Sequence, residues 1–282
     1  MSILEAIILG IVQGITEFLP ISSTAHLTIT GKIMGLINAN KPEEWTAVIA
    51  IIQLGTLVSI LVYFAKDIYN IVIEFFRDNL IERKGYKQQS LNSRLGWLVI
   101  IGTIPVVIVG LGFKDIIEGA LTKNLYVIAT SLIVLAIILF IAEKTAKFNK
   151  KLEDVGIWDA VVVGIAQAFA LIPGSSRSGT TITGGLFMGL NREAAARFSF
   201  LLSIPAILAS GLLQLKVGLE FLNHDHLIAV AVATVVSGVS GYLAIDFLLK
   251  FLRKNSTNLF IVYRIVAGLI ILALLFSNTI TP

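Results

Sequence analysis

Six long apolar stretches dominate the pattern of hydrophobic and polar positions along the chain. Each is close to the length of about 20 residues that an α-helix needs to cross the hydrocarbon core of a bilayer. The sequence therefore predicts six membrane-spanning helices, at residues 45–65, 95–113, 124–142, 193–214, 227–250 and 259–277.

Two further apolar segments, at about 3–36 and 155–190, are interrupted near their middle. The first is interrupted by PISS at 20–23 and the second by PGSS at 173–176. Non-helical backbone at membrane depth persists only where protein or a polar cavity satisfies its hydrogen bonds. Because broken helices of this kind surround binding sites, we expect two re-entrant helical hairpins that meet around a site.

The two interrupted segments resemble each other in sequence. The first begins GIVQ at residue 10 and the second begins GIAQ at residue 164, and Pro20 aligns with Pro173 after a slip of one residue. Two stretches with the same order of glycine, glutamine and proline indicate an internal repeat.

The repeat predicts the fold class. The halves, at about 1–142 and 155–282, each hold one hairpin and three spans, and an odd number of crossings inverts the second half. We therefore expect an all-α polytopic membrane protein with an inverted-topology repeat, built as a single integral membrane domain over 1–282.

Composition supports a membrane protein. The 282 residues are 56% hydrophobic and 14% charged, and the mean hydropathy is +0.88, well above the values of soluble domains. The net charge of +4 is explained by an excess of lysine and arginine in cytoplasmic loops, so it indicates no nucleic-acid partner. Since the chain has no cysteine, disulfides, thiolate metal sites and cysteine nucleophiles are excluded.

The distribution of basic residues predicts the orientation. With six spans and two hairpins, fifteen basic residues fall on one face, mostly in loops 66–94 and 143–155, and five fall on the other. The basic face is the cytoplasmic one, so both termini should lie outside. The first ten residues, MSILEAIILG, lack a basic region and a small-residue cleavage site, so we expect no removable signal peptide.

The second interruption has the composition of an anion site. PGSSRSGTT at 173–181 precedes a helix, and the free N–H groups at a helix N-terminus favour an anion. Arg177 adds a planar fork that can hold two phosphate oxygens. An arginine that merely reaches the interface is the alternative. The absence of a following Gly-Lys-Ser/Thr argues against a nucleotide loop. The candidate phosphate ligands around Arg177 are Gly174, Ser175, Ser176 and Ser178.

The first interruption supplies different chemistry. Gln13 and Glu17 are four residues apart, so they share one face of a helix. A hydroxyl cluster at 22–24 and His26 follow the proline. These side chains offer a nucleophile, a proton carrier and ligands for a divalent cation, with Glu17 and Gln13 as the metal candidates. Capping of the next helix would explain the serines and the threonine, but not Glu17 or His26.

A second histidine pair gives only a weak signal. His224 and His226 lie in the polar sequence LNHDHL, where solvation is the favoured interpretation and a metal pair is the alternative.

Together these motifs resemble a known family. GITEFLPISSTAHL at 14–27 and PGSSRSGTT at 173–181 are similar to the two signature motifs of the bacterial undecaprenyl-diphosphate phosphatases, also called bacitracin-resistance proteins. The resemblance extends over nearly the whole chain, including VIAIIQLGTL at 48–57 and YRIVAGL at 263–269. It implies hydrolysis of undecaprenyl diphosphate to the monophosphate carrier of cell-wall synthesis and a divalent cation, Mg²⁺ or Ca²⁺.

The resemblance also implies roles for individual residues. It places Glu17, Ser23, His26 and Arg177 in the catalytic core, with Ser22, Thr24, Ser176 and Thr181 in support. Some members carry glutamate at the position of Gln13, so this chain has a single carboxylate at the first tip. A mechanism that needs two carboxylates there is not expected.

Several alternatives remain open on sequence. Ser23 either attacks the phosphorus itself or positions water, and either His26 or Glu17 takes the proton. The alternative function is transport of a phosphorylated lipid carrier, because inverted repeats are common in transporters. A second class of lipid phosphatase is excluded, since it needs a histidine after its Ser-Arg motif and none lies between Arg177 and His224. We expect a bacterial plasma-membrane location with the site open to the outer side, and a homodimer is compatible with this interpretation.

Overall fold

The structure, a computed structural model, describes residues 1–37, 42–113, 124–221 and 224–281. These residues form eleven α-helices and no strands, and one isolated bridge joins Lys150 to Leu190. The predicted all-α class is therefore confirmed. The helices are α1 (Ile3–Phe18), α2 (Ser23–Ile33), α3 (Pro42–Tyr63), α4 (Ala65–Phe76), α5 (Leu91–Gly112), α7 (Leu125–Thr145), α8 (Ile157–Ala168), α9 (Arg177–Phe187), α10 (Arg192–Phe221), α11 (His224–Leu252) and α12 (Asn258–Phe276).

Six of these helices are long and apolar enough to cross a membrane. The prediction of six spans is confirmed, with bounds that differ by a few residues. The qualifying segments are Glu44–Tyr63, Leu91–Gly112, Leu125–Thr145, Arg192–Leu213, Leu227–Leu252 and Asn258–Phe276. The chain is thus a multi-pass membrane protein.

The two interrupted segments each form a pair of short helices. α1 and α2 flank the first break, and α8 and α9 flank the second. α2 and α9 are both 11 residues long and begin 154 positions apart, as do α1 and α8. The slip of one residue in the sequence alignment is therefore wrong. With the constant offset of 154 residues, Pro173 corresponds to Leu19, and the two prolines lie one position apart in the two breaks.

The short helices pack against helices of the opposite half. α1 lies along α11, and α8 lies along α5. Glycines permit this close approach: a Cβ at Gly14 would lie 2.6 Å from the backbone nitrogen of Gly241, and one at Gly164 would lie 2.9 Å from the Cα of Gly102. Small residues at helix contacts let the backbones come together in a membrane protein.

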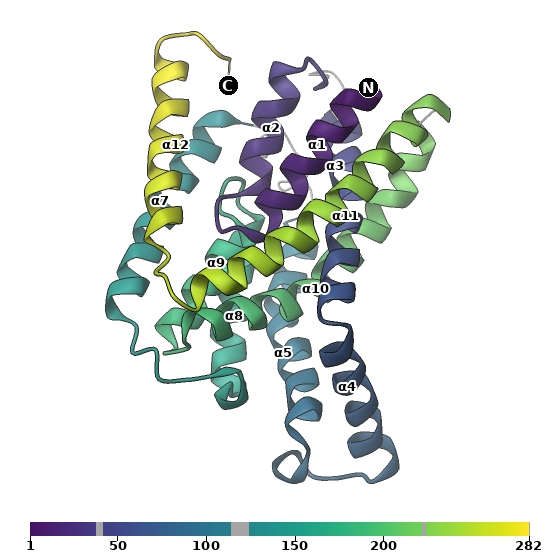
Figure 1. Cartoon of the computed structure of the whole chain (residues 1–282), viewed down its shortest axis with the longest axis vertical. Coiled ribbons are helices and arrows are strands. Elements are labelled where there is room, and N and C mark those ends of the chain that lie inside the picture. Colours follow the sequence, from purple (N-terminus) through teal and green to yellow (C-terminus); the bar gives the residue numbers. More distant parts are fainter. Residues whose placement is uncertain (38–41, 114–123, 222–223, 282) are drawn as a thin grey trace.

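The molecule has two different ends along its longest axis (Figure 1). The start of α1 and the end of α12 lie at one end, and α4 and the first part of α5 extend together at the other. A π-helix at Arg77–Ile81 and a short 3₁₀ helix at Tyr86–Gln88 connect α4 to α5. The buried carboxylate of Asp78 closes this connection by accepting hydrogen bonds from the Ser90 amide at 2.7 Å and from Lys84 Nζ at 3.1 Å.

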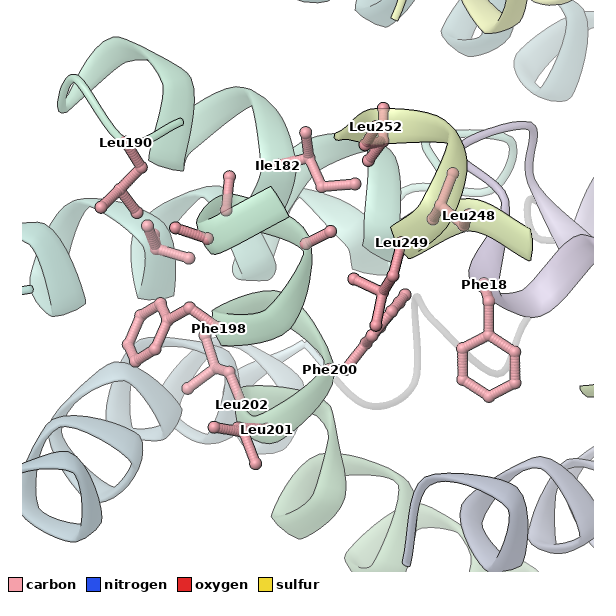
Figure 2. Close-up of a cluster of buried hydrophobic side chains, with 14 of the residues drawn as sticks. Phe18, Ile182, Leu190, Phe198, Phe200, Leu201, Leu202, Leu248, Leu249 and Leu252 are labelled. Carbon is pink, nitrogen blue, oxygen red and sulfur yellow. The ribbon is translucent and has the colours of Figure 1, made fainter. Parts of the chain in front are cut away.

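A large apolar core lies beside the two breaks. Figure 2 shows Phe198, Phe200 and Leu202 of α10 with Leu248 and Leu249 of α11, and Phe18 at the end of α1. The rings of Phe18 and Phe200 meet edge to face, with 5.3 Å between centroids. Because the residue after Phe18 begins the first break, this packing fixes the position of the break against α10.

Some sequence predictions fall on residues that the structure does not describe. These are the side chains of His224 and His226, and Lys41, Lys114, Lys123 and Lys216 of the expected outer face.

Candidate functional site

The carboxylate of Glu17, in the last turn of α1, is the centre of the candidate site. It is 5% exposed and accepts hydrogen bonds from four side chains. Gln13 Nε2 and Ser23 Oγ donate to Oε2 at 2.9 and 2.8 Å. Gln53 Nε2 donates to Oε1 at 2.8 Å, and Arg177 makes a short ion pair with the same oxygen. Glu17 therefore joins the two breaks, which are far apart in the sequence.

The backbone at the first break aims the hydroxyl of Ser23. Ser22 has a φ of 76°, in the left-handed region, and its side chain caps α2 by accepting from the Ala25 amide at 3.3 Å. A non-glycine residue in this region is strained, and such strain persists where the surrounding structure fixes it. The turn directs Ser23 back toward Glu17, whereas its neighbour Thr24 is exposed.

The second break repeats this geometry. Ser176 has a φ of 69°, and its side chain caps α9 by accepting from the Gly179 amide at 3.2 Å. The residue after the cap is Arg177, whose NH1 is buried and has no hydrogen-bond partner within the described part of the chain. Ser178 Oγ donates to the carbonyl of Leu19 at 3.1 Å, so a second contact joins the two breaks.

The other predicted residues of the second motif face inward. Gly174 has a φ of 86°, and a Cβ there would lie 2.9 Å from the Cα of Ile128. Ser175 is fully buried, and its hydroxyl has no partner among the described residues. The hydroxyl of Thr181 lies 2.5 Å from that of Ser199 on α10. Gly174 and Thr181 thus lie where the turn meets neighbouring helices.

The imidazole of His26 does not bond to Ser23 in this structure. Its Nδ1 lies 2.7 Å from the Ser22 carbonyl, and its Nε2 lies 2.6 Å from the hydroxyl of Tyr263 on α12. A carbonyl only accepts, so Nδ1 carries a proton, and in the neutral ring Nε2 accepts from the tyrosine. Both ring nitrogens are therefore engaged.

Three residues of the site were missed by the sequence analysis: Gln53, Tyr263 and Arg264. Arg264 is fully buried and donates to the carbonyl of Ser175 at 2.9 Å. A signal for two of them was present. Gln53 interrupts an apolar run on a predicted span, and Arg264 is a charge inside another, and both are costly in lipid.

The arrangement is suited to a phosphate group. The charges at the centre are those of Glu17, Arg177 and Arg264, which leave one positive charge in excess. Arg177 NH1 offers an unused donor at the start of α9, and Ser23 offers a hydroxyl next to a carboxylate. A hydroxyl beside a carboxylate and a guanidinium is an arrangement compatible with phosphoryl transfer.

The residues partly fit a divalent cation. Gln13 Oε1 is buried and has no partner among the described residues, and Nε2 of the same side chain donates to Glu17. Among the described residues no group of three or more histidine, aspartate or glutamate side chains could hold a metal. One carboxylate and one amide oxygen suit a cation that takes its other ligands from phosphate and water.

Comparison with known proteins identifies the family. The sequence model of the family described as "Bacitracin resistance protein BacA" matches residues 6–270. A relative from Syntrophobacter fumaroxidans named "Undecaprenyl-diphosphatase" is 55% identical over 278 residues, which cover 99% of both chains. A relative with that name from Chloroherpeton thalassium is 50% identical, and the alignment covers 98% of this chain and 97% of the relative. Another from Myxococcus xanthus is 49% identical, with 100% of this chain and 92% of the relative covered.

The family match covers most of the chain, and the relatives align with it over nearly their full length. The chain belongs to the bacitracin resistance protein BacA family.

Proposed function

We propose that this protein hydrolyses undecaprenyl diphosphate to undecaprenyl phosphate and inorganic phosphate. The observation that carries the proposal is the contact of Ser23 Oγ with Glu17, 2.8 Å long, directly beside the guanidinium of Arg177. The relatives named undecaprenyl-diphosphatase support the substrate. The product is the lipid carrier of peptidoglycan synthesis, and its regeneration accounts for resistance to bacitracin.

The chemistry follows from the contacts at the first break. Ser23 Oγ attacks the terminal phosphorus while its proton passes to Glu17 Oε2. The bond from that phosphorus to the bridging oxygen breaks, and undecaprenyl phosphate leaves with the bonding electrons. Water then attacks the phosphoserine and releases phosphate, and the proton on Glu17 returns to the serine. Arg177 NH1 and the amides at the start of α9 hold the phosphate oxygens.

Glu17 is the better placed of the two candidate bases. Its Oε2 lies 2.8 Å from the Ser23 hydroxyl, whereas the Nε2 of His26 is bonded to Tyr263. Proton transfer requires the base to be within hydrogen-bond reach. His26, whose two ring nitrogens bond to the Ser22 carbonyl and to Tyr263, is assigned to hold the first break in place and not to take the Ser23 proton.

Glu17 and Gln13 would hold a divalent cation, Mg²⁺ or Ca²⁺, together with the diphosphate oxygens. When bound, the cation neutralises negative charge on the diphosphate. Ser22, Ser175 and Ser176 supply the backbone turn and amides around the phosphate, and Thr24, at the exposed side of the first break, is assigned to contact the substrate from outside.

The topology is part of the same proposal. The two helix pairs are re-entrant hairpins of an inverted repeat, with both termini and the site opening on the outer side of the plasma membrane. The constant 154-residue offset of the helix pairs supports the repeat, and so does the matching contact of α1 with α11 and of α8 with α5. Labelling of single cysteines, introduced at Ser2 and in loop 143–155, by a membrane-impermeant reagent tests the orientation. The homodimer is a separate proposal, tested by the mass of the protein in detergent.

The main test measures inorganic phosphate released from a prenyl diphosphate by detergent-purified protein. We expect release by the wild type and a loss of orders of magnitude in Ser23→Ala. The control Ser203→Ala, whose buried hydroxyl donates to the Phe200 carbonyl of its own helix, should change release little. A chelator should reduce release, and added Mg²⁺ or Ca²⁺ should restore it. Folded wild type that releases no phosphate with cation present would refute the enzyme and leave transport as the alternative.

A second experiment separates attack by Ser23 from attack by water. Acid quenching of the enzyme with substrate labelled in the terminal phosphate should trap label on Ser23. Release of phosphate without any trapped label, under conditions where hydrolysis of the intermediate is slow, would favour direct attack by water.

A further inference from the structure

Two adjacent residues of α12 reach both breaks of the candidate site. The hydroxyl of Tyr263 lies 2.6 Å from His26 Nε2 at the first break. The guanidinium of Arg264 donates to the carbonyls of Ser175 and Gly174 at the second, at 2.9 and 3.5 Å. Neighbouring residues of an α-helix point about 100° apart. One turn of α12 therefore contacts both halves of the site.

Arg264 is a buried charge whose partners are all uncharged. Its side chain is 0% exposed, and within the described part of the chain it bonds only to carbonyl groups, including that of Leu132 on α7 at 3.3 Å. A buried charge without a counter-charge is strongly destabilising. If Arg264 served only to fill space, an apolar side chain of the same size would serve better.

The position of the guanidinium shows where its charge acts. Arg264 NH1 has no hydrogen-bond partner among the described residues, and a Cβ at Gly179 would lie 2.5 Å from it. The guanidinium thus lies against the first turn of α9, which begins at Arg177. Its positive charge adds to the positive end of the α9 dipole. Its hydrogen bonds also engage the carbonyl oxygens of Gly174 and Ser175, so that these two acceptors would not repel a phosphate bound beside Arg177.

Tyr263 restrains the ring of His26. With Nδ1 bonded to the Ser22 carbonyl at 2.7 Å and Nε2 to the tyrosine, the ring is held at both nitrogens. The two rings also lie nearly parallel, with centroids 5.6 Å apart and an interplanar angle of 12°. Tyr263 is 43% exposed, so packing in the core does not explain its place.

We propose that Tyr263 and Arg264 are positioning residues of the phosphatase site. Tyr263 fixes the orientation and tautomer of His26, and Arg264 fixes the turn at 174–176 and makes its surroundings positive. The inference rests on the proposed function, because it assigns parts of one reaction to the two residues. Since both come from one helical turn, α12 sets how the nucleophile side and the anion side face each other.

The first test replaces Tyr263 with phenylalanine, which removes one oxygen from a half-exposed side chain. We expect kcat for phosphate release to fall about threefold to tenfold, as for the loss of one hydrogen bond, with KM nearly unchanged. In a His26→Gln background the same change should have no further effect, because the two residues act together. The control is Tyr242→Phe, whose ring packs on Tyr63.

The second test compares Arg264→Met with Arg264→Lys. We expect the methionine variant to raise KM and the inhibition constant of inorganic phosphate by about tenfold or more. Lysine should rescue most of this loss, because it keeps the charge, and a purely structural role would not follow charge in this way. The control is Arg253→Met, which breaks the exposed pair with Glu193.

Thermal unfolding in detergent is measured for every variant. If Arg264→Met does not fold, the Tyr263→Phe arm and the lysine variant still test the proposal. Tyr263→Phe and Arg264→Met variants that fold and keep kcat and KM within about twofold of an active wild type would overturn it. A wild type that releases no phosphate would instead refute the proposed function itself, so the two failures are distinguishable.

Discussion

Two buried carboxylates of this protein accept similar sets of hydrogen bonds but should respond differently to the same substitution. Glu17 is 5% exposed and Glu143 is 6% exposed. Glu143, near the end of α7, is paired with Arg192 of α10 and accepts from the Thr257 hydroxyl at 2.8 Å. Each carboxylate therefore has one arginine and additional neutral donors, and glutamine can replace either with little change of shape.

The cost in stability can be worked from the ion pairs. Breaking a fully buried pair by removing one partner costs about 3–5 kcal/mol. The side chains of Arg177 and Arg192 are 16% and 28% exposed, so water partly compensates each. We therefore expect a loss of roughly 2–3 kcal/mol for Glu17→Gln and for Glu143→Gln. This corresponds to a fall in Tm of roughly 4–12 °C.

The cost in activity should separate the two variants. Glu17→Gln removes the group that accepts the Ser23 proton, and loss of a general base lowers kcat by about 10²–10⁴. Glu143→Gln should leave kcat within about twofold, because Glu143 lies between α7, α10 and α12 on the side that bears the basic loops. The assay is phosphate release per folded protein, measured well below the Tm of each variant.

Either of two results would refute this reasoning. Full activity in Glu17→Gln would show that the carboxylate is not the base. An equal loss of kcat in folded Glu143→Gln would show that the defect reflects general destabilisation of the helices and not chemistry at the first break.

Three other predictions follow from buried or hydrogen-bonded polar groups. Gln53→Leu removes a hydrogen-bond donor to Glu17, so kcat for phosphate release should fall about threefold to tenfold, while the control Ser203→Ala shows no change. An unaltered kcat in Gln53→Leu would contradict the assignment of Gln53 to the site. Gln167 is 0% exposed, and neither atom of its side-chain amide has a hydrogen-bond partner among the described residues. Gln167→Leu should therefore keep or raise the Tm and leave phosphate release intact, and a large fall in Tm would contradict this. The hydrogen bond from the Ser90 amide lowers the pKa of Asp78 from 3.8 to about 2, so its stabilising effect is complete above pH 3.8 and is lost as the pH falls toward 2. Cleavage of segment 77–90 by pepsin should therefore accelerate over that range in the wild type, and Asp78→Asn should be cleaved rapidly throughout; equal acceleration in both would be the contrary result.

The spans and the breaks could be predicted from the sequence because each has a local cause. Length and hydrophobicity define the six long helices. Pro20 and Pro173 lie between the two short helices of each interrupted segment, where a residue without an N–H group does not continue a helix. The one-residue slip was wrong because it was chosen to align the two prolines. A proline restricts the backbone only at its own position and at the residue before it, so two similar turns can carry it at different positions.

The contacts within the site could be predicted only in part. Spacing places Gln13 and Glu17 on one helix face, and their hydrogen bond of 2.9 Å agrees with this. Contacts between distant residues, such as Gln53 with Glu17 and Tyr263 with His26, depend on which helices pack together. Spacing also could not choose between His26 and Glu17 as the partner of Ser23, because that choice depends on the left-handed φ of the residue before it.

The constant offset of 154 residues separates what the two halves share from what distinguishes them. The capping serines shape the chain in both halves, because Ser22 and Ser176 cap α2 and α9 with φ values of 76° and 69°. Gln13 also matches Gln167 in position.

In the proposed mechanism, the reaction depends mainly on positions that differ between the halves. Where the first half has Glu17, Ser23 and His26, the second has Leu171, Arg177 and Thr180. If both halves carried the residues of the first half, two carboxylates would lie together. If both carried those of the second half, two guanidinium groups would lie together. In either case, like charges would repel at short range. A serine beside a carboxylate requires a cation opposite it to hold a phosphate. Different residues at equivalent positions of two similar turns therefore provide the two parts of the proposed site. Gln167 is equivalent to Gln13, but no carboxylate follows it four residues later, so it lacks the partner that Gln13 has.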